Sequence, residues 1–105
     1  MNALQYANEK FHSAVLLLVE NGSAQERLYN AFMAFHPVQA SDFADAKMRA
    51  KYEEIMQRLT VMRDPDKGYV LAALEIMSDE QARSINRLIV GLAIEIAEAR
   101  AQGIG

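Results

Sequence analysis

The chain of 105 residues contains no cysteine. This absence excludes disulfide bonds, thiolate zinc sites and cysteine nucleophiles, so packing must supply the stability of the fold. Glycine is also sparse and forms no cluster that could cradle a phosphate. No serine stands in a Gly-x-Ser-x-Gly motif, so a serine nucleophile is not indicated either. The sequence therefore gives no positive sign of an enzyme, and we expect no catalytic residue and no cofactor.

Long apolar runs are missing as well. The run from Ala14 to Val19 has six residues, whereas a membrane-spanning helix needs about 20. The other apolar stretch, near the end of the chain, is interrupted by four charged residues: Arg87, Glu95, Glu98 and Arg100. The first residues lack the basic region of a secretion signal. We therefore expect a cytoplasmic protein that does not bind a membrane.

Neither sign of charge dominates any part of the chain. Residues 1–62 hold six basic and seven acidic side chains, and residues 63–105 hold five and seven, for a net charge of −3. Binding to a phosphate backbone draws on clustered lysine and arginine, and no such cluster is present. We therefore do not expect nucleic acid as a partner. The alternative, a nucleic-acid-associated regulator, would use Lys47, Lys51 and Arg58 or Arg83 and Arg87.

Helical spacing of apolar residues is found along the whole chain, and strand-like alternation is hard to find. The pattern predicts an all-α fold: a single domain over 1–105 formed by a bundle of four to five mostly antiparallel helices, with a frayed tail at 102–105. We expect the first, third and fifth helices to supply the main core, the second to brace them and the fourth to bridge. The predicted helices span about 3–20, 24–35, 42–62, 65–77 and 79–101.

Local signals set most of these boundaries. Ser23 and Glu26 have the capping-box spacing, and Ser78 and Gln81 repeat it. Asn21-Gly22 closes the first helix, and Ser41 or Asp42 is expected to cap the third. Asp64-Pro65 is a strong start for the fourth helix.

The last predicted helix is apolar on more than one face. Ile85, Ile89, Leu92, Ile96 and Ala99 form one apolar row along it, which we call the first seam. A second seam lies beside the first and consists of Val90, Ala93, Ile94 and Ala97. At about 1.5 Å per residue the helix is roughly 33 Å long, more than a small domain easily covers by itself.

A surface helix does not need a second apolar seam, so something must cover it. The residues 14–19 of the first helix, themselves apolar nearly all round, could do so within one chain. Our leading hypothesis is instead a homodimer, with an unidentified protein partner as a further possibility. The interface residues predicted on this basis are Ile85, Ile89, Val90, Ala93, Ile94 and Ala97.

A metal-dependent helical enzyme is the alternative from another class. Glu9 and His12 have the Glu-x-x-His spacing that brings a carboxylate and an imidazole to one helical face, as in di-iron bundles. Such sites need a second pair, yet the only other histidine, His36, has Met33 in place of the glutamate. Glu9, His12 and His36 are therefore weak metal-ligand candidates, and we expect no bound metal.

A helix-turn-helix around Ser78 is a further hypothesis. Asp79 and Glu80 would lie at the start of its reading helix, where they would face phosphates. The spacing also offers acidic partners such as Asp79 to Arg83 and Arg87. Both features disfavour direct DNA binding.

Overall fold

Four long helices and one short 3₁₀ turn form the described part of the chain, which covers residues 2–60 and 73–103 of a computed structural model. No strand occurs within these residues, and the all-α prediction is confirmed. Residues 73–76 are helical and belong to the predicted fourth helix, whose residues 65–72 lie outside the described part. The elements are α1 (Ala3–Leu18), α2 (Ala24–Phe35), η1 (Ala40–Asp42), α3 (Ala46–Leu59) and α5 (Asp79–Ala101).

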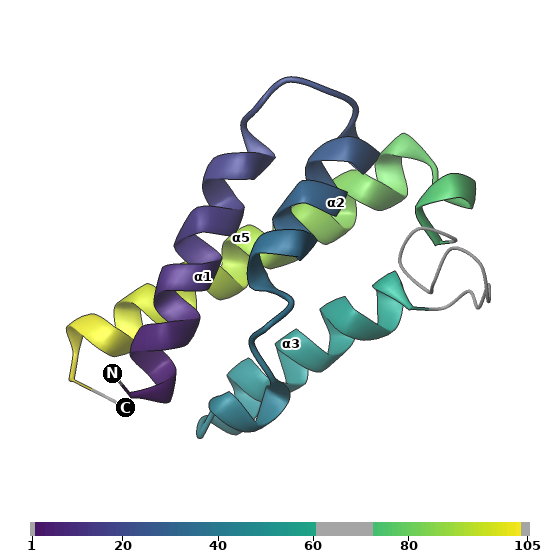
Figure 1. The fold of residues 1–105 in the computed structure, drawn as a ribbon. Coiled ribbons are helices and arrows are strands. Elements are labelled where there is room, and N and C mark those ends of the chain that lie inside the picture. The colour runs from purple at the N-terminus through teal and green to yellow at the C-terminus, as the bar shows by residue number, and fades with distance from the viewer. Residues whose placement is uncertain (1, 61–72, 104–105) are drawn as a thin grey trace.

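Antiparallel neighbours dominate the arrangement, as Figure 1 shows. The helices α1 and α2 form a hairpin, and α5 crosses beneath both, running antiparallel to α1. The helix α3 packs on the other side of α5 and runs antiparallel to it. The first turn of α1 and the last turn of α5 therefore lie at the same end of the molecule.

The two capping boxes are both formed. Ser23 Oγ accepts a hydrogen bond from Glu26 N at 3.1 Å, and Ser78 Oγ accepts from Gln81 N, also at 3.1 Å. In return each N3 side chain accepts from the backbone amide of its serine. These contacts satisfy free amides of the first turn and therefore set the starts of α2 and α5. Both helices also end where the sequence predicts.

The first helix ends two residues earlier than predicted, at Leu18. Arg27 of α2 donates through Nη1 to the Leu18 carbonyl oxygen at 3.3 Å, so this carbonyl is satisfied by a side chain instead of by another helical turn. The chain then turns through residues 19–23, where Gly22 has a φ of 120° that residues with a side chain rarely adopt.

The predicted start of the third helix at 42 is wrong. Asp42 closes the 3₁₀ turn η1 by accepting from Gln39 N at 2.8 Å, and Asp45 caps α3 by accepting from the amides of Lys47 and Met48. Between them Phe43 is buried, with 1% of its surface exposed. Tertiary burial of this ring keeps the backbone of Phe43 extended, and α3 therefore begins only at Ala46. At its other end α3 stops at Leu59, before the predicted 62.

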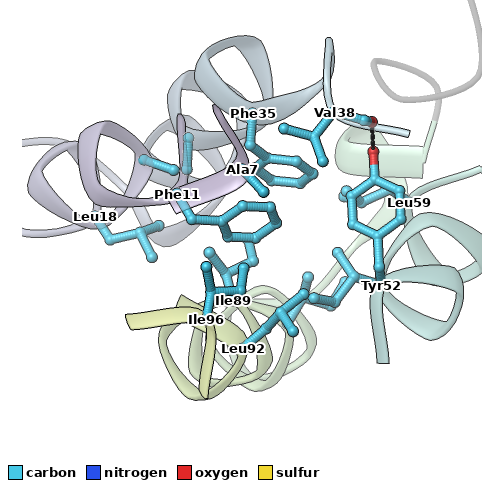
Figure 2. Close-up of a cluster of buried hydrophobic side chains, with 14 of the residues drawn as sticks. Ala7, Phe11, Leu18, Phe35, Val38, Tyr52, Leu59, Ile89, Leu92 and Ile96 are labelled. Carbon is cyan, nitrogen blue, oxygen red and sulfur yellow. Dashed lines mark hydrogen bonds between the residues drawn. The ribbon is translucent and has the colours of Figure 1, made fainter. Parts of the chain in front are cut away.

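An aromatic cluster fills the centre of the fold (Figure 2). The Phe11 and Phe35 rings stack with centroids 4.9 Å apart, and the Tyr52 ring lies 6.1 Å from each of them. Edge-to-face and offset pairs of this kind add about 0.5–1.5 kcal/mol each to the burial of their surface. The cluster joins α1, α2 and α3 above the inner face of α5.

The second helix is part of the core and not a brace. Leu28, Ala31 and Phe35 of α2 are fully buried, and α2 packs extensively against both α1 and α5. The helix α3 makes its main helix contacts with α5 and reaches α1 chiefly through the Tyr52 ring. The expected core of the first, third and fifth helices is thus extended by α2, while Ile55 and Leu59 of α3 are fully buried in the same core.

Candidate functional site

The first seam of α5 lies against the rest of the chain along the whole helix. Ile85 is 3% exposed, and Ile89, Leu92 and Ile96 are fully buried, as Figure 2 shows for the last three. Two residues of the predicted interface, Ile85 and Ile89, are therefore core residues of a single chain. The length of α5 is also covered: burial runs from Ala82 to Ala99. Helix length gives no independent reason to invoke a second copy.

The second seam is divided between the interior and the surface. Val90 and Ala93 are half-buried and pack against the core. Ile94, in contrast, exposes 53% of its surface, and Ala97 is exposed as well. The helix α1 lies beside this part of α5 and covers one edge of the seam. The chain thus closes the inner half of the second seam and leaves Ile94 and Ala97 outside.

The outward strip of α5 consists of Arg87, Gly91, Ile94 and Glu98. Their spacings of four, three and four residues place them on one helical face, directly opposite the buried first seam. All four are exposed. A Cβ atom added to Gly91 would meet nothing within 4 Å, so the backbone of α5 is open to approach from outside at this point.

The apolar surface continues from α5 onto α1. Val90 and Val19 line one depression between the end of α1 and the first half of α5, and Val19 is 77% exposed. Leu16, one helical turn before Val19, exposes 54% of its surface. The polar side chains around this depression come from α2 and α5 and are Arg27, Arg83, Asn86 and Arg87. Leu16 of α1 and Val19, which directly follows α1, both belong to the run 14–19 that the sequence marks as apolar nearly all round.

Charged groups near the start of α5 pair differently from the prediction. Asp79 accepts a hydrogen bond from Gln25 Nε2 at 2.9 Å, which ties α5 to α2, and it forms no ion pair with Arg83. Arg87 Nη2 instead lies 3.1 Å from Glu80 Oε1. Both side chains of this pair are about two-thirds exposed or more, at 66% and 76%. Glu98 forms no ion pair within the described residues.

One ion pair links α3 to the flank of α5. Lys51 Nζ lies 2.6 Å from Glu95 Oε1, while Glu95 Oε2 is buried without a hydrogen-bond partner in the described part of the chain. The remaining α3 cations that a nucleic-acid regulator would use are Lys47 and Arg58, and Arg58 pairs with Glu54 at 3.3 Å. Pairing with acids on the same surface reduces the attraction that these cations could offer to phosphates.

The weak metal-ligand candidates do not form a cluster. Glu9, His12 and His36 are all exposed, and the His36 ring stacks on Phe32 with centroids 5.5 Å apart. Within residues 2–60 and 73–103, no group of three or more histidine, aspartate or glutamate side chains is arranged to hold a metal ion.

Tyr52 places a hydroxyl at the centre of the fold. It donates a hydrogen bond to the carbonyl oxygen of Val38 (Figure 2). Burial, together with the nearby negative charge of Asp42, raises the pKa of Tyr52 to about 12. The phenol is therefore a neutral structural donor at ordinary pH and is not poised for proton transfer.

Comparison of the chain with protein-family models, with curated proteins and with solved structures returned no match. None of the described helices combines the length and the apolar character that crossing a bilayer would require. The arrangement of the surface itself is therefore the basis for a functional proposal.

Proposed function

We propose that this chain acts through protein–protein contacts in the cytoplasm and forms a homodimer through the outward strip of α5. The observation that carries the proposal is Ile94, which projects from the middle of the longest helix with 53% of its surface exposed, between two charged residues of the same strip. Large apolar side chains on an outward face, continuous with others on a neighbouring helix, are typical of interaction surfaces.

The apolar surface beside Ile94 supports this proposal. Val90, one helical turn before Ile94, lines a depression together with Val19, and Val19 and Leu16 are themselves exposed apolar residues. Three arginines and Asn86 line the depression beside Val90, and a polar rim around an apolar centre is the usual composition of a protein interface. Within the described residues the candidate metal-binding side chains do not converge, and contact with another protein is the function that this surface supports best.

Sedimentation velocity over a concentration series tests the proposal. We expect the wild-type chain to sediment as a dimer at micromolar concentration, and Ile94→Glu to sediment as a folded monomer because a charge would be buried against the partner. Met33→Glu is the matched control: Met33 is 49% exposed on α2, far from this surface along the chain, and the substitution changes the net charge equally. A wild-type chain that remains monomeric over the whole series would contradict the proposal.

A further inference from the structure

The outward strip of α5 is complementary in charge and size to a second copy of itself that runs in the opposite direction. Arg87 and Glu98 lie equally far from the midpoint between Leu92 and Ala93, and so do Gly91 and Ile94. Reversing the helix about this midpoint therefore exchanges a cation with an anion and the smallest residue with a large apolar one. A two-fold axis perpendicular to a helix performs this operation on two identical chains.

We propose that two copies pack their α5 helices antiparallel about a two-fold axis that passes between residues 92 and 93. Ile94 of each copy then covers Gly91 of the other, and Arg87 of each copy pairs with Glu98 of the other. This inference rests on the proposed function, since it assigns the orientation and register of that dimer.

Steric fit supports this register. Helices pack with their axes about 8–10 Å apart, and small residues at the contact allow the shorter distance. The surface around Gly91 is open, with nothing within 4 Å of the place that a Cβ atom would occupy. An isoleucine from the facing helix can fill this gap, and the two-fold axis creates the same contact twice.

Charge selects the antiparallel orientation over the parallel one. A parallel pair of α5 helices would place Arg87 opposite Arg87 and Glu98 opposite Glu98, and like charges in contact oppose association. In the antiparallel pair both contacts join opposite charges. The existing ion pair between Arg87 and Glu80 does not prevent Arg87 from pairing with Glu98 of the second copy. Both of its side chains are exposed, and such exposed pairs contribute little to the stability of the fold.

Reversal of the two charges tests the register. We expect Arg87→Glu or Glu98→Arg alone to weaken dimerisation about tenfold, because each change puts two pairs of like charges into the dimer. The double variant Arg87→Glu with Glu98→Arg restores the pairs in reverse, and its dissociation constant should return to within about threefold of the wild type. Lys47→Glu and Glu53→Arg, on the exposed face of α3, are controls with the same changes in net charge and should leave dimerisation unchanged.

Gly91→Ala separates the fold from the interface. Alanine favours a helix over glycine by about 1 kcal/mol, and the added methyl group meets nothing within the chain, so the monomer should become more stable. The same methyl group occupies the space assigned to Ile94 of the second copy. We therefore expect a higher dissociation constant of the dimer. We also expect a higher melting temperature of the monomer, measured at a protein concentration below that dissociation constant.

A spin label measures the orientation directly. The chain has no cysteine, so Ala101→Cys, at the exposed last residue of α5, provides a single site of attachment. In the antiparallel pair the two labelled residues are separated by about 25 Å along the helix axis, whereas a parallel pair leaves them about 10 Å apart. Pulsed electron–electron double resonance between the two spin labels distinguishes these distances.

The outcomes separate the two proposals. A dimer that shows the short label distance, or that the double charge reversal does not restore, overturns the antiparallel register and leaves the proposed function standing. A wild-type monomer overturns both. A dimer with the long distance, restored by the double reversal and weakened by Gly91→Ala, supports the register.

Discussion

The inner and outer faces of α5 differ in the composition and burial of their side chains. The inner face is a regular row of branched apolar side chains, of which Ile89, Leu92 and Ile96 are fully buried. The outer face contains one large apolar residue, Ile94, placed among a glycine and two opposite charges. The inner face is accounted for by the packing of this chain alone. The composition of the outer face is not, and this difference is the reason why we propose the outer face as the contact with a second copy.

The largest expected effect contrasts two isoleucines five positions apart. Ile89→Ala should lower the free energy of unfolding by about 2–5 kcal/mol, because it leaves a cavity at a fully buried site. Ile94→Ala should change the stability of the monomer by less than about 0.5 kcal/mol. Urea denaturation, carried out below the concentration at which the chain associates, measures both. Equal losses at the two positions would show that the two faces do not differ as described.

A smaller effect concerns the buried hydroxyl of Tyr52, which lies in the core above the inner face of α5. Tyr52→Phe removes the donor to the Val38 carbonyl oxygen and should cost about 1–2 kcal/mol in urea denaturation at neutral pH. The wild-type protein should also lose this advantage at high pH. The pKa of Tyr52 is raised to about 12 in the folded state, above the unfolded value of 10.0, so the folded state retains the proton longer.

The resulting stabilisation is fully present below pH 10 and is lost as the pH rises from 10 towards 12. The difference in stability between wild type and Tyr52→Phe should therefore shrink across this interval. Using the difference removes the contribution of lysines and other tyrosines, which titrate in both proteins. A constant difference up to pH 12 would argue against a buried, neutral phenol.

The smallest expected effect lies on the flank between the two faces. Lys51→Ala removes the ion pair with Glu95, whose two side chains are 49% and 36% exposed, and should cost no more than about 1 kcal/mol. Added salt should reduce the wild-type advantage, because it screens the pair. Thermal unfolding at low and high ionic strength provides the measurement, and a loss as large as that of Ile89→Ala would place this flank in the core.

Sequence signals that act within one turn predicted the fold most accurately. Ser23 with Glu26, and Ser78 with Gln81, locate the starts of α2 and α5 because a capping box needs only residues three apart. The start of α3 could not be located in this way. Asp42 and Asp45 are both acceptable caps, and the choice depends on the burial of Phe43 among rings from α1 and α3.

The candidate site was only partly predictable for a similar reason. The sequence marks Arg87, Gly91, Glu95 and Glu98 as the polar or neutral strip of the last helix, and it assigns Ile94 to the second seam. The structure places Glu95 on the flank that faces α3. Which members of that seam reach the surface depends on where α1 lies, and this is a property of the tertiary arrangement. The structure leaves Val90 half-buried beside α1 and Ile94 exposed.

The connector between α2 and α3 is not a suitable place for new chain termini. Although it is the longest connection among the described residues, it is anchored: Val38 and Phe43 are each 1% exposed, and Arg49 binds the carbonyl oxygens of Phe43 and Ala44. The short turn over residues 19–23 is exposed throughout. New termini for a circular permutant, or an inserted peptide tag, therefore belong between Asn21 and Gly22, and the longer connector should stay intact.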